Sequence, residues 1–359
     1  FRRLFGPRGV LHCYATALDE AGEDPRFGAW GKQKCDDTGP LTAKRMETVD
    51  REFLTAAEGF IDKAHQANKP FFVWYNTTRM HIWTHLEPGA EGKTGIGVYP
   101  DGMVEHDGMV GELLAQLDQL GIADDTIVMY STDNGAETMS WPDGGMTPFR
   151  SEKNTNWEGA FRIPMVVRWP GHVPAGSVSN GIVQHHDWLP TFLEMAGEPD
   201  IVEKCKKGVQ AIGRTYKNHI DGFSLLGHIT GKEKESPRKL FVYISDDGDI
   251  LGIRYDNWKV VFMEQRLPGT MAVWAEPFVR LRLPKVFNLR TDPFERADTT
   301  SNSYYQWFLY HAYILYGAYT IADRFAATFK DFPPVQKPNT FTIDDALSKM
   351  AEAAAGGSN

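Results

Sequence analysis

The chain has 359 residues, of which 42% are hydrophobic, 24% charged and 12% aromatic, and its formal net charge is −9 at pH 7. This composition is typical of a folded globular protein and argues against a largely disordered chain. The negative charge and the lack of a long Lys/Arg run argue against a nucleic-acid partner or an anionic membrane surface. No apolar stretch approaches the roughly 20 residues that a bilayer requires, so we predict no membrane span.

The cysteines and the first residues indicate which crosslinks, metal sites and processing to expect. Cys13, Cys35 and Cys205 are odd in number and lack C-x-x-C spacing. They predict neither a disulfide framework nor a zinc site, although they leave room for one disulfide. Phe1 is not an initiator and residues 1–10 contain no apolar signal segment, so we expect the sequence to begin inside a longer reading frame or after processing.

The first part of the chain has few periodic segments. Residues 1–46 are rich in Gly, Pro and Asp, and we predict a long irregular lead-in. An apolar stripe between Phe53 and Ala64 then predicts a helix over 47–67. The continuous apolar run FFVWYN at 71–76 predicts a central parallel strand that is covered on both faces.

The same helix-then-strand unit follows once more. Leucines up to Leu120, with Gly121 as a C-terminal cap, predict a second helix, and TIVMYS at 126–131 predicts the next buried strand. MVVRW at 165–169 predicts a third strand, and a further helix is expected near 187–196. This alternation indicates an α/β fold.

The hydrophobic pattern of the sequence changes after residue 232. Short alternating runs separated by Asp-Gly and Asp-Asn predict a small antiparallel sheet, and an aromatic and Ala-rich stretch at 303–330 predicts one closing helix. We therefore divide the chain into a large domain at 1–232, a small α+β subdomain at 233–340 and a tail at 341–359.

Polar residues follow the predicted strands, where ligands collect in open α/β sheets. Asp133 and Asn134 place a carboxylate and an amide oxygen next to each other, and Gly135 would permit a sharp turn. Hard cations such as Ca²⁺ or Mg²⁺ prefer such oxygens, but a calcium site needs about 6 to 8 of them, so other ligands must come from elsewhere. The alternative is an ordinary Asx turn without a metal.

Two cationic or titratable side chains complete the candidate site. His81 follows the first predicted strand, where an imidazole can bind an anion or donate a proton to a leaving group. Lys153 stands among small polar residues before Trp157, where it can contact an anionic oxygen. The alternatives are a hydrogen-bonded structural histidine and a solvated lysine.

Taken together, these stretches resemble the type I sulfatases of the alkaline-phosphatase-like superfamily. The resemblance rests on an ordered series along the chain: T-D-N-G at 132–135, F-R-x-x-K-x-x-x-W-E-G at 149–159 and I-P-x-x-V-R-W-P-G at 163–171. It implies a mixed, mostly parallel sheet sandwiched by helices, with a small C-terminal antiparallel sheet and a packing helix.

The resemblance also implies roles. Asp133 and Asn134 match metal ligands of the family, usually for Ca²⁺, although Mg²⁺ is an alternative. Lys153 matches the lysine that contacts the sulfate, and His81 matches the histidine that faces the substrate and leaving group. A formylglycine, made from Cys or Ser in a C/S-x-P-x-R motif, supplies the nucleophile. The expected partner is a small-molecule, carbohydrate or lipid sulfate ester, and the family is mostly periplasmic, secreted or lysosomal.

The sequence departs from the family in one respect. No Cys or Ser begins a C/S-x-P-x-R motif, and the family's early strand that ends in an Asp pair and supplies the other metal ligands is also missing. We therefore expect the nucleophile and N-terminal strands in a part of the protein outside this chain, so that the chain alone is an inactive fragment. The alternatives are a phosphoester hydrolase of the same superfamily and a catalytically inactive binding protein with the sulfatase fold.

Overall fold

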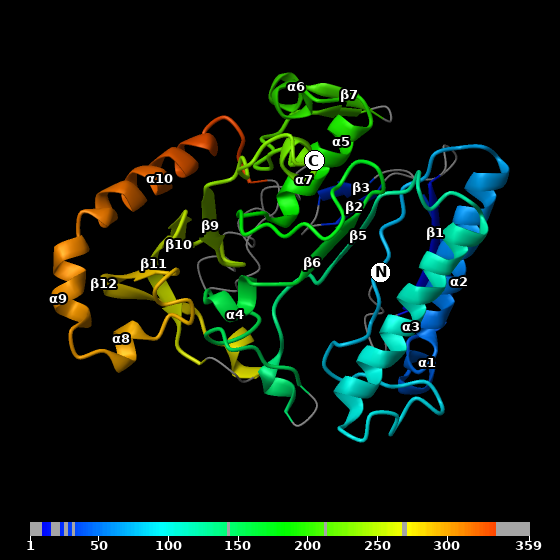
Figure 1. The fold of residues 1–359 in the computed structure, drawn as a ribbon, viewed down its shortest axis with the longest axis horizontal. Coiled ribbons are helices and arrows are strands. Elements are labelled where there is room, and N and C mark those ends of the chain that lie inside the picture. Colours follow the sequence, from blue (N-terminus) through cyan, green and yellow to red (C-terminus); the bar gives the residue numbers. More distant parts are fainter. Residues whose placement is uncertain are drawn as a thin grey trace, which may run out of the picture.

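The computed structural model describes residues 9–15, 22–24, 28–30, 33–141, 144–211, 214–267 and 271–334 (Figure 1). The first helices lie at one end of the molecule, and the largest sheet with the last helices lies at the other. The predicted tail at 341–359 lies outside the described residues. No helix in the described part is both long and apolar enough to cross a membrane.

The elements of the first part are β1 (Gly9–Ala15), β2 (Gly22–Asp24), β3 (Gly28–Trp30), β4 (Gln33–Pro40), α1 (Ala43–Met46), α2 (Val49–Gln66), α3 (Val98–Gln119), β5 (Val128–Ser131), the 3-10 helix η1 (Thr138–Ser140), α4 (Glu158–Phe161) and β6 (Met165–Arg168). After them come η2 (His185–Asp187), α5 (Trp188–Met195), α6 (Ile201–Lys207), β7 (Val209–Ala211), β8 (Arg214–Tyr216) and α7 (Leu226–Ile229). The C-terminal part contains β9 (Leu240–Ile244), β10 (Ile250–Tyr255), β11 (Trp258–Gln265), η3 (Met271–Trp274), β12 (Phe278–Asn288), α8 (Ala297–Thr300), α9 (Tyr304–His311) and α10 (Ile314–Thr328).

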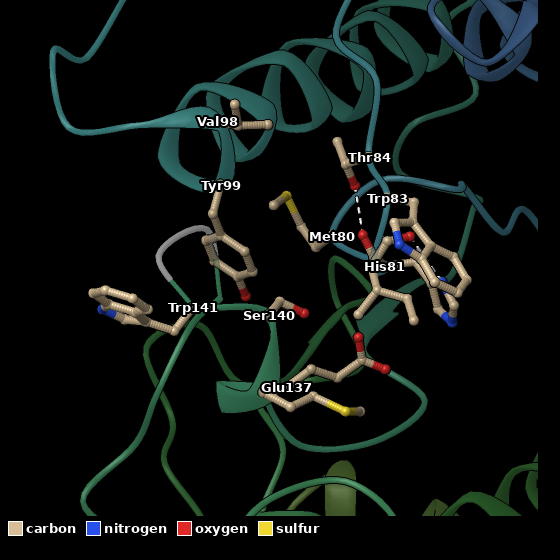
Figure 2. A pocket seen from close by; sticks show the side chains of 11 residues that line it. Met80, His81, Trp83, Thr84, Val98, Tyr99, Glu137, Ser140 and Trp141 are labelled. Carbon is tan, nitrogen blue, oxygen red and sulfur yellow. Dashed lines mark hydrogen bonds between the residues drawn. The ribbon is translucent and has the colours of Figure 1, made fainter. Parts of the chain in front are cut away.

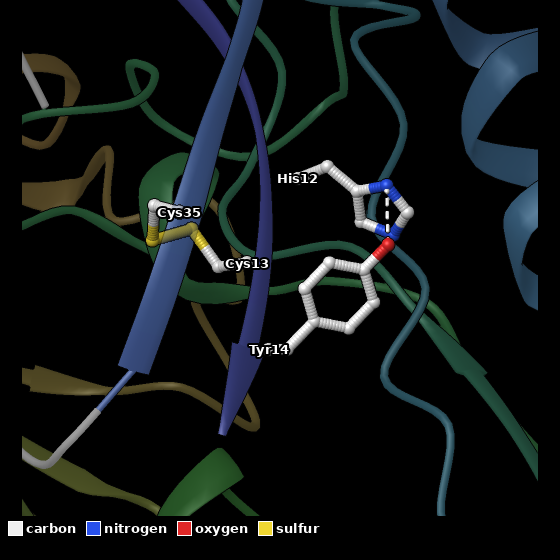
Figure 3. The surroundings of a disulfide bond; sticks show 4 residues. All are labelled: His12, Cys13, Tyr14 and Cys35. Atoms are coloured by element: carbon white, nitrogen blue, oxygen red, sulfur yellow. Dashed lines mark hydrogen bonds between the residues drawn. A yellow bond between two sulfur atoms is a disulfide. The ribbon is translucent and has the colours of Figure 1, made fainter. Parts of the chain in front are cut away.

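The described residues before α1 are more regular than the sequence indicates, because they contain four strands. β1 pairs antiparallel with β4, and β2 pairs with β3. Cys13 lies opposite Cys35 in the β1–β4 register, and the two form a disulfide across the strands (Figure 3). The prediction of an irregular segment over 1–46 is therefore wrong for β1 and β4. Neither strand shows hydrophobic alternation, and cysteine spacing alone does not reveal that Cys13 and Cys35 pair.

The two long helices α2 and α3 pack side by side (Figure 1). Their shared core contains Ile61, Leu117 and Ala123, with Phe71 and Val73 packed against it. The helix predicted over 47–67 is confirmed as α2. α3 begins at Val98, well before the apolar stripe that indicated it, because its first turns carry polar residues and glycines.

The run at 71–76 does not become a strand of a sheet. It is extended, but its backbone has no ladder partner among the described residues. Phe71 and Val73 face the helix core, whereas the side chains of Phe72 and Trp74 are 67% and 80% exposed. The prediction of a strand covered on both faces is therefore wrong here, since the described part of the chain covers only one face.

The next two predicted strands do form. β5 and β6 fall within the predicted ranges 126–131 and 165–169, and they pair antiparallel, with Met129 opposite Val167. Among the described residues the two strands form a two-stranded antiparallel sheet. Val166 on β6 is 63% exposed, so this face of the pair is also open to solvent.

The predicted C-terminal antiparallel sheet and its packing helix are present. The strand order is β12-β11-β10-β9, and Ile253, Val260 and Val286 form a core with Phe308 of α9 and Ala318 of α10. The single helix predicted over 303–330 is interrupted between α9 and α10. This break lets both helices contribute to the same core.

The opposite face of the C-terminal sheet meets the segment before α4. Val261, Phe287 and Leu289 form a second core with Trp157. Because side chains alternate along a strand, Lys259 and Val261 share this face, whereas Val260 points to α10. The 150–161 segment is thereby fixed against the C-terminal sheet.

Candidate functional site

A cavity of about 280 Å³ lies between the loop after residue 76, the start of α3 and the segment around η1. In Figure 2 Tyr99 and the loop that carries His81 and Trp83 face each other, and Glu137 reaches toward that loop. The lining residues are Met80, His81, Ile82, Trp83, Thr84, Val98, Tyr99, Glu137, Met139, Ser140 and Trp141. Of the four predicted site residues, only His81 lines this cavity.

The His81 loop is held from both long helices. The Asp50 carboxylate of α2 accepts the backbone N–H groups of Thr78 (2.7 Å) and Arg79 (3.0 Å). The buried Arg79 guanidinium donates to Glu105 of α3 (2.7 and 3.0 Å). These bonds fix the backbone just before His81, whose ring Nδ1 lies 3.3 Å from its neighbour's carbonyl oxygen. Among the described residues the imidazole has no further hydrogen-bond partner, so its other nitrogen can face a ligand.

The loop also stores backbone strain. Met80 and Trp83 adopt φ angles of +67° and +61°, a region that side-chain-bearing residues rarely occupy. Such outliers cluster at binding sites, where the surrounding contacts enforce them. Met80 and Trp83 flank His81 in the chain, and all three line the cavity.

The turn after β5 presents Asp133 and Asn134 outward. Asp133 is exposed, and its carboxylate accepts no hydrogen bond in the part of the chain that the structure describes. The Asn134 side-chain N–H donates to the Gly135 carbonyl (2.9 Å), which leaves the amide oxygen open. The Thr132 hydroxyl donates to the Asn134 carbonyl (3.0 Å) and closes the turn. The Asx turn, which was the alternative for this motif, is therefore not formed by Asp133.

Gly135 lies in close contact with the backbone of residues 159–160. Its N–H donates to the Ala160 carbonyl (2.8 Å), and a Cβ at this position would lie 1.8 Å from the carbonyl oxygen of Gly159. Gly135 is not among the described glycines with positive φ. The expectation that this glycine permits a sharp turn is therefore replaced by a steric requirement.

Lys153 is neither solvated nor free. Its ammonium lies 2.7 Å from Glu137 Oε1, and the two side chains are only 15% and 6% exposed. Its backbone N–H donates to the Ala136 carbonyl (3.2 Å), which ties the loop of Lys153 to the turn after β5. Glu137 lines the cavity and therefore connects Lys153 with the side on which His81 lies. Nothing in the sequence distinguished Glu137 from a surface carboxylate.

Other buried groups support this arrangement. The buried Glu152 carboxylate accepts the Met139 N–H (2.8 Å), and burial raises its pKa. Burial, together with the charge of Glu137, also raises the pKa of Tyr99. The Tyr99 phenol therefore stays protonated and remains a hydrogen-bond donor at the cavity wall.

The metal-binding capacity of the described residues is partial. Asp133 and Asn134 are two side chains with open oxygens of the type that Ca²⁺ and Mg²⁺ prefer. No group of three or more His, Cys, Asp or Glu side chains in the described part of the chain is arranged to hold a metal ion. The donor set thus fits a hard cation in its chemistry and falls short in number.

Comparison with known proteins places these features in context. The Sulfatase family model matches residues 17–198, just over half of the chain. N-acetylgalactosamine-6-sulfatase of Canis lupus familiaris is 28% identical over 277 residues, which cover 72% of this chain and 49% of that protein. Arylsulfatase A of Homo sapiens is 28% identical over 221 residues, which cover 60% of this chain and 40% of that protein.

A solved structure agrees with these matches. The PsFucS1 sulfatase from Pseudoalteromonas sp. superposes with a TM-score of 0.70 at 27% identity, covering 86% of this chain and 59% of that chain. This chain spans less than half the length of the two curated relatives above. The helices, the β5–β6 pair and the C-terminal sheet accordingly belong to an alkaline-phosphatase-like α/β fold. By family match and by fold, the chain belongs to the type I sulfatases.

Proposed function

We propose that the protein containing this chain hydrolyses sulfate esters and that the chain carries part of the site. The observation that carries the proposal is the buried Lys153–Glu137 pair beside the cavity wall that holds His81. A fixed, water-shielded cation next to a cavity suits the charge of a sulfate group. Membership of the sulfatase family supports the same reaction.

The residues of this chain take separate roles. Asp133 and Asn134 would hold a divalent cation, Ca²⁺ in preference to Mg²⁺, together with ligands from outside this sequence. When bound, the cation supplies charge stabilisation to the transferring sulfuryl group. Lys153 binds a sulfate oxygen, and Glu137 keeps the ammonium in position. His81 donates a proton to the leaving oxygen.

The nucleophile does not come from the 359 residues. No C/S-x-P-x-R motif occurs in them, so a formylglycine has no place among the residues described. We propose that another part of the protein supplies it. The sulfated partner is a small molecule, a carbohydrate or a lipid.

The test compares the chain with a longer gene product that carries the motif. The 359-residue chain should release no 4-nitrophenol from 4-nitrophenyl sulfate, whereas the longer protein should turn it over. In the longer protein Lys153→Ala should lower kcat by about 10²-fold to 10³-fold, the usual effect of losing one stabiliser of transition-state charge.

The matched control is Lys63→Ala, because Lys63 is an exposed lysine of α2. It should leave kcat unchanged. Turnover of the sulfate ester by the 359-residue chain would contradict the proposal, as would a longer protein that hydrolyses only phosphate esters.

A further inference from the structure

Lys259 of β11 is a fully buried cation that does not line the cavity. Its ammonium lies 2.6 Å from Glu295 Oε1 and 3.3 Å from Glu158 Oε1. It also donates to the carbonyl of Asn156 (2.8 Å) and lies 4.3 Å from the ring centroid of Tyr243. The ammonium thus has two hydrogen-bond acceptors, on Asn156 and Glu158, and a close ion-pair partner in Glu295.

These acceptors belong largely to one segment, residues 156–158. The Glu158 backbone N–H donates to Glu295 Oε2 (2.7 Å), so the two carboxylates and the ammonium close around the start of α4. The Asn156 side chain donates to the Met263 carbonyl on β11 (2.7 Å). The segment is therefore attached to the C-terminal sheet by both backbone and side-chain bonds.

The charges around Glu158 favour its ionised form. Burial alone would raise the pKa of this carboxyl, but the charges of Lys259 and Arg254 outweigh it, and the Tyr243 hydroxyl donates to Glu158 Oε1 (2.8 Å). The resulting pKa is about 2. Glu158 is thus a carboxylate, and Lys259 faces a permanent partner.

The same segment continues to the turn that carries Asp133. Gly159 donates to the Arg150 carbonyl (2.8 Å), and the Ala160 carbonyl accepts the Gly135 N–H (2.8 Å). A Cβ on Gly159 would lie 2.1 Å from the Ser151 carbonyl oxygen, so these backbones are in direct contact. A shift of residues 156–160 is therefore transmitted to both the turn and the loop of Lys153.

We propose that Lys259 is a positioning residue of the site, which holds residues 156–160 so that the 133–137 turn and Lys153 keep their places. This inference rests on the proposed function, because it treats Asp133, Asn134 and Lys153 as working residues. Burying an unpaired ammonium is costly, and a buried ion pair is rarely a net source of stability. The contribution of Lys259 is therefore to hold residues 156–160 in place. Through this residue the C-terminal sheet supports the site.

The test is amide hydrogen exchange of the 359-residue chain. Lys259→Met should raise the exchange rate in peptides covering 133–137 and 150–160 by about tenfold, the effect of losing about one net hydrogen bond from the closed state. The matched control is Val260→Ala, which weakens the same strand on the face toward α10. It should leave those peptides unchanged.

A second variant keeps the test valid if Lys259→Met fails to fold. Glu295→Gln removes the charge that Lys259 faces at 2.6 Å and retains an oxygen for the Glu158 N–H. It should raise exchange in the same peptides by a smaller factor. Equal exchange in 133–137 for wild type, Lys259→Met and Glu295→Gln would overturn the proposal, and so would an equal rise in Val260→Ala.

Activity of the longer protein separates the two proposals. Lys259→Met should lower kcat and raise the calcium concentration needed for half-maximal rate, whereas Val260→Ala should change neither. A wild-type protein without sulfatase activity defeats the proposed function, while the exchange result still decides whether Lys259 holds the turn. Normal activity and calcium dependence in Lys259→Met overturn the positioning role alone.

Discussion

Gly135 lies where the turn after β5 touches the backbone of Gly159. The contact leaves no room for a side chain, because a Cβ would sit 1.8 Å from a carbonyl oxygen. That oxygen belongs to backbone that is itself packed on residues 150–151, so it cannot move aside cheaply. The requirement for glycine after Asp133-Asn134 is steric.

Gly135→Ala should therefore lower the free energy of unfolding by about 2 to 3 kcal/mol, the cost of overpacking a close contact. The control is Gly111→Ala on α3, where a Cβ meets nothing within 4 Å. There alanine should raise stability by about 0.5 to 1 kcal/mol. Urea unfolding followed by circular dichroism measures both, and a Gly135→Ala protein as stable as wild type would refute the contact.

At the scale of elements, α3 and β5 are joined by a half-buried histidine. His106 of α3 lies 3.1 Å from the Tyr130 hydroxyl of β5 and 3.3 Å from the Thr77 hydroxyl. Burial lowers the pKa of His106, because the charged imidazolium would lose its hydration there. The charges of Asp50 and Asp107 act in the opposite direction without reversing this shift.

The contribution of His106 to folding stability should decrease in acid. The folded chain holds His106 neutral, whereas the unfolded chain binds a proton near pH 6.5, so its contribution is full above about pH 6.5 and is lost as pH falls. His106→Gln keeps a neutral hydrogen-bonding group that does not titrate. Thermal unfolding between about pH 7.5 and pH 5 should show a smaller loss of Tm for the variant than for wild type. Parallel pH profiles would exclude His106 as a cause.

Some of these elements could be predicted from the sequence and others could not. The stripe of α2 and the alternation in β9 to β12 were predictable, because each pattern reflects burial on one local face. The β1–β4 pair and the exposed face of 71–76 were not, since both depend on segments distant in the chain. The site residues differ in the same way. Asp133 and His81 could be predicted because they follow apolar runs in the sequence. Glu137 and Lys259 could not, because in the sequence they resemble surface charges and only the folded structure shows them buried.

At the scale of the whole molecule, the described chain exposes apolar side chains on the 71–76 run and on β6. Phe72, Trp74 and Val166 are more than half exposed, and the backbone of 71–76 has no ladder partner among the described residues. Unpaired strand edges and open apolar faces favour association with other chains.

The 359-residue chain should therefore aggregate and bind hydrophobic dyes. Replacing both Phe72 and Trp74 by Ser should lower the fluorescence of 8-anilinonaphthalene-1-sulfonate and slow aggregation measured by light scattering, because these are the two large apolar side chains that the 71–76 run exposes. Tyr316→Ser on α10 is the control, an equally exposed aromatic residue outside this region. A control that lowers the dye signal as much as the double variant would contradict the assignment.

The contact of Gly135 with Gly159 also determines where this protein can vary. The chain leaves the clamped backbone after η1 and returns to it at Arg150, whose carbonyl accepts the Gly159 N–H. Exchanges inside the stretch before Arg150 are restricted, because a Cβ on Gly144 would lie 2.4 Å from the Glu137 carbonyl oxygen and one on Gly145 would lie 2.7 Å from the Tyr99 hydroxyl. Trp141 is different, since its side chain is 81% exposed and lines the cavity. An exchange at Trp141 therefore changes the cavity rim and leaves the Asp133 turn in place.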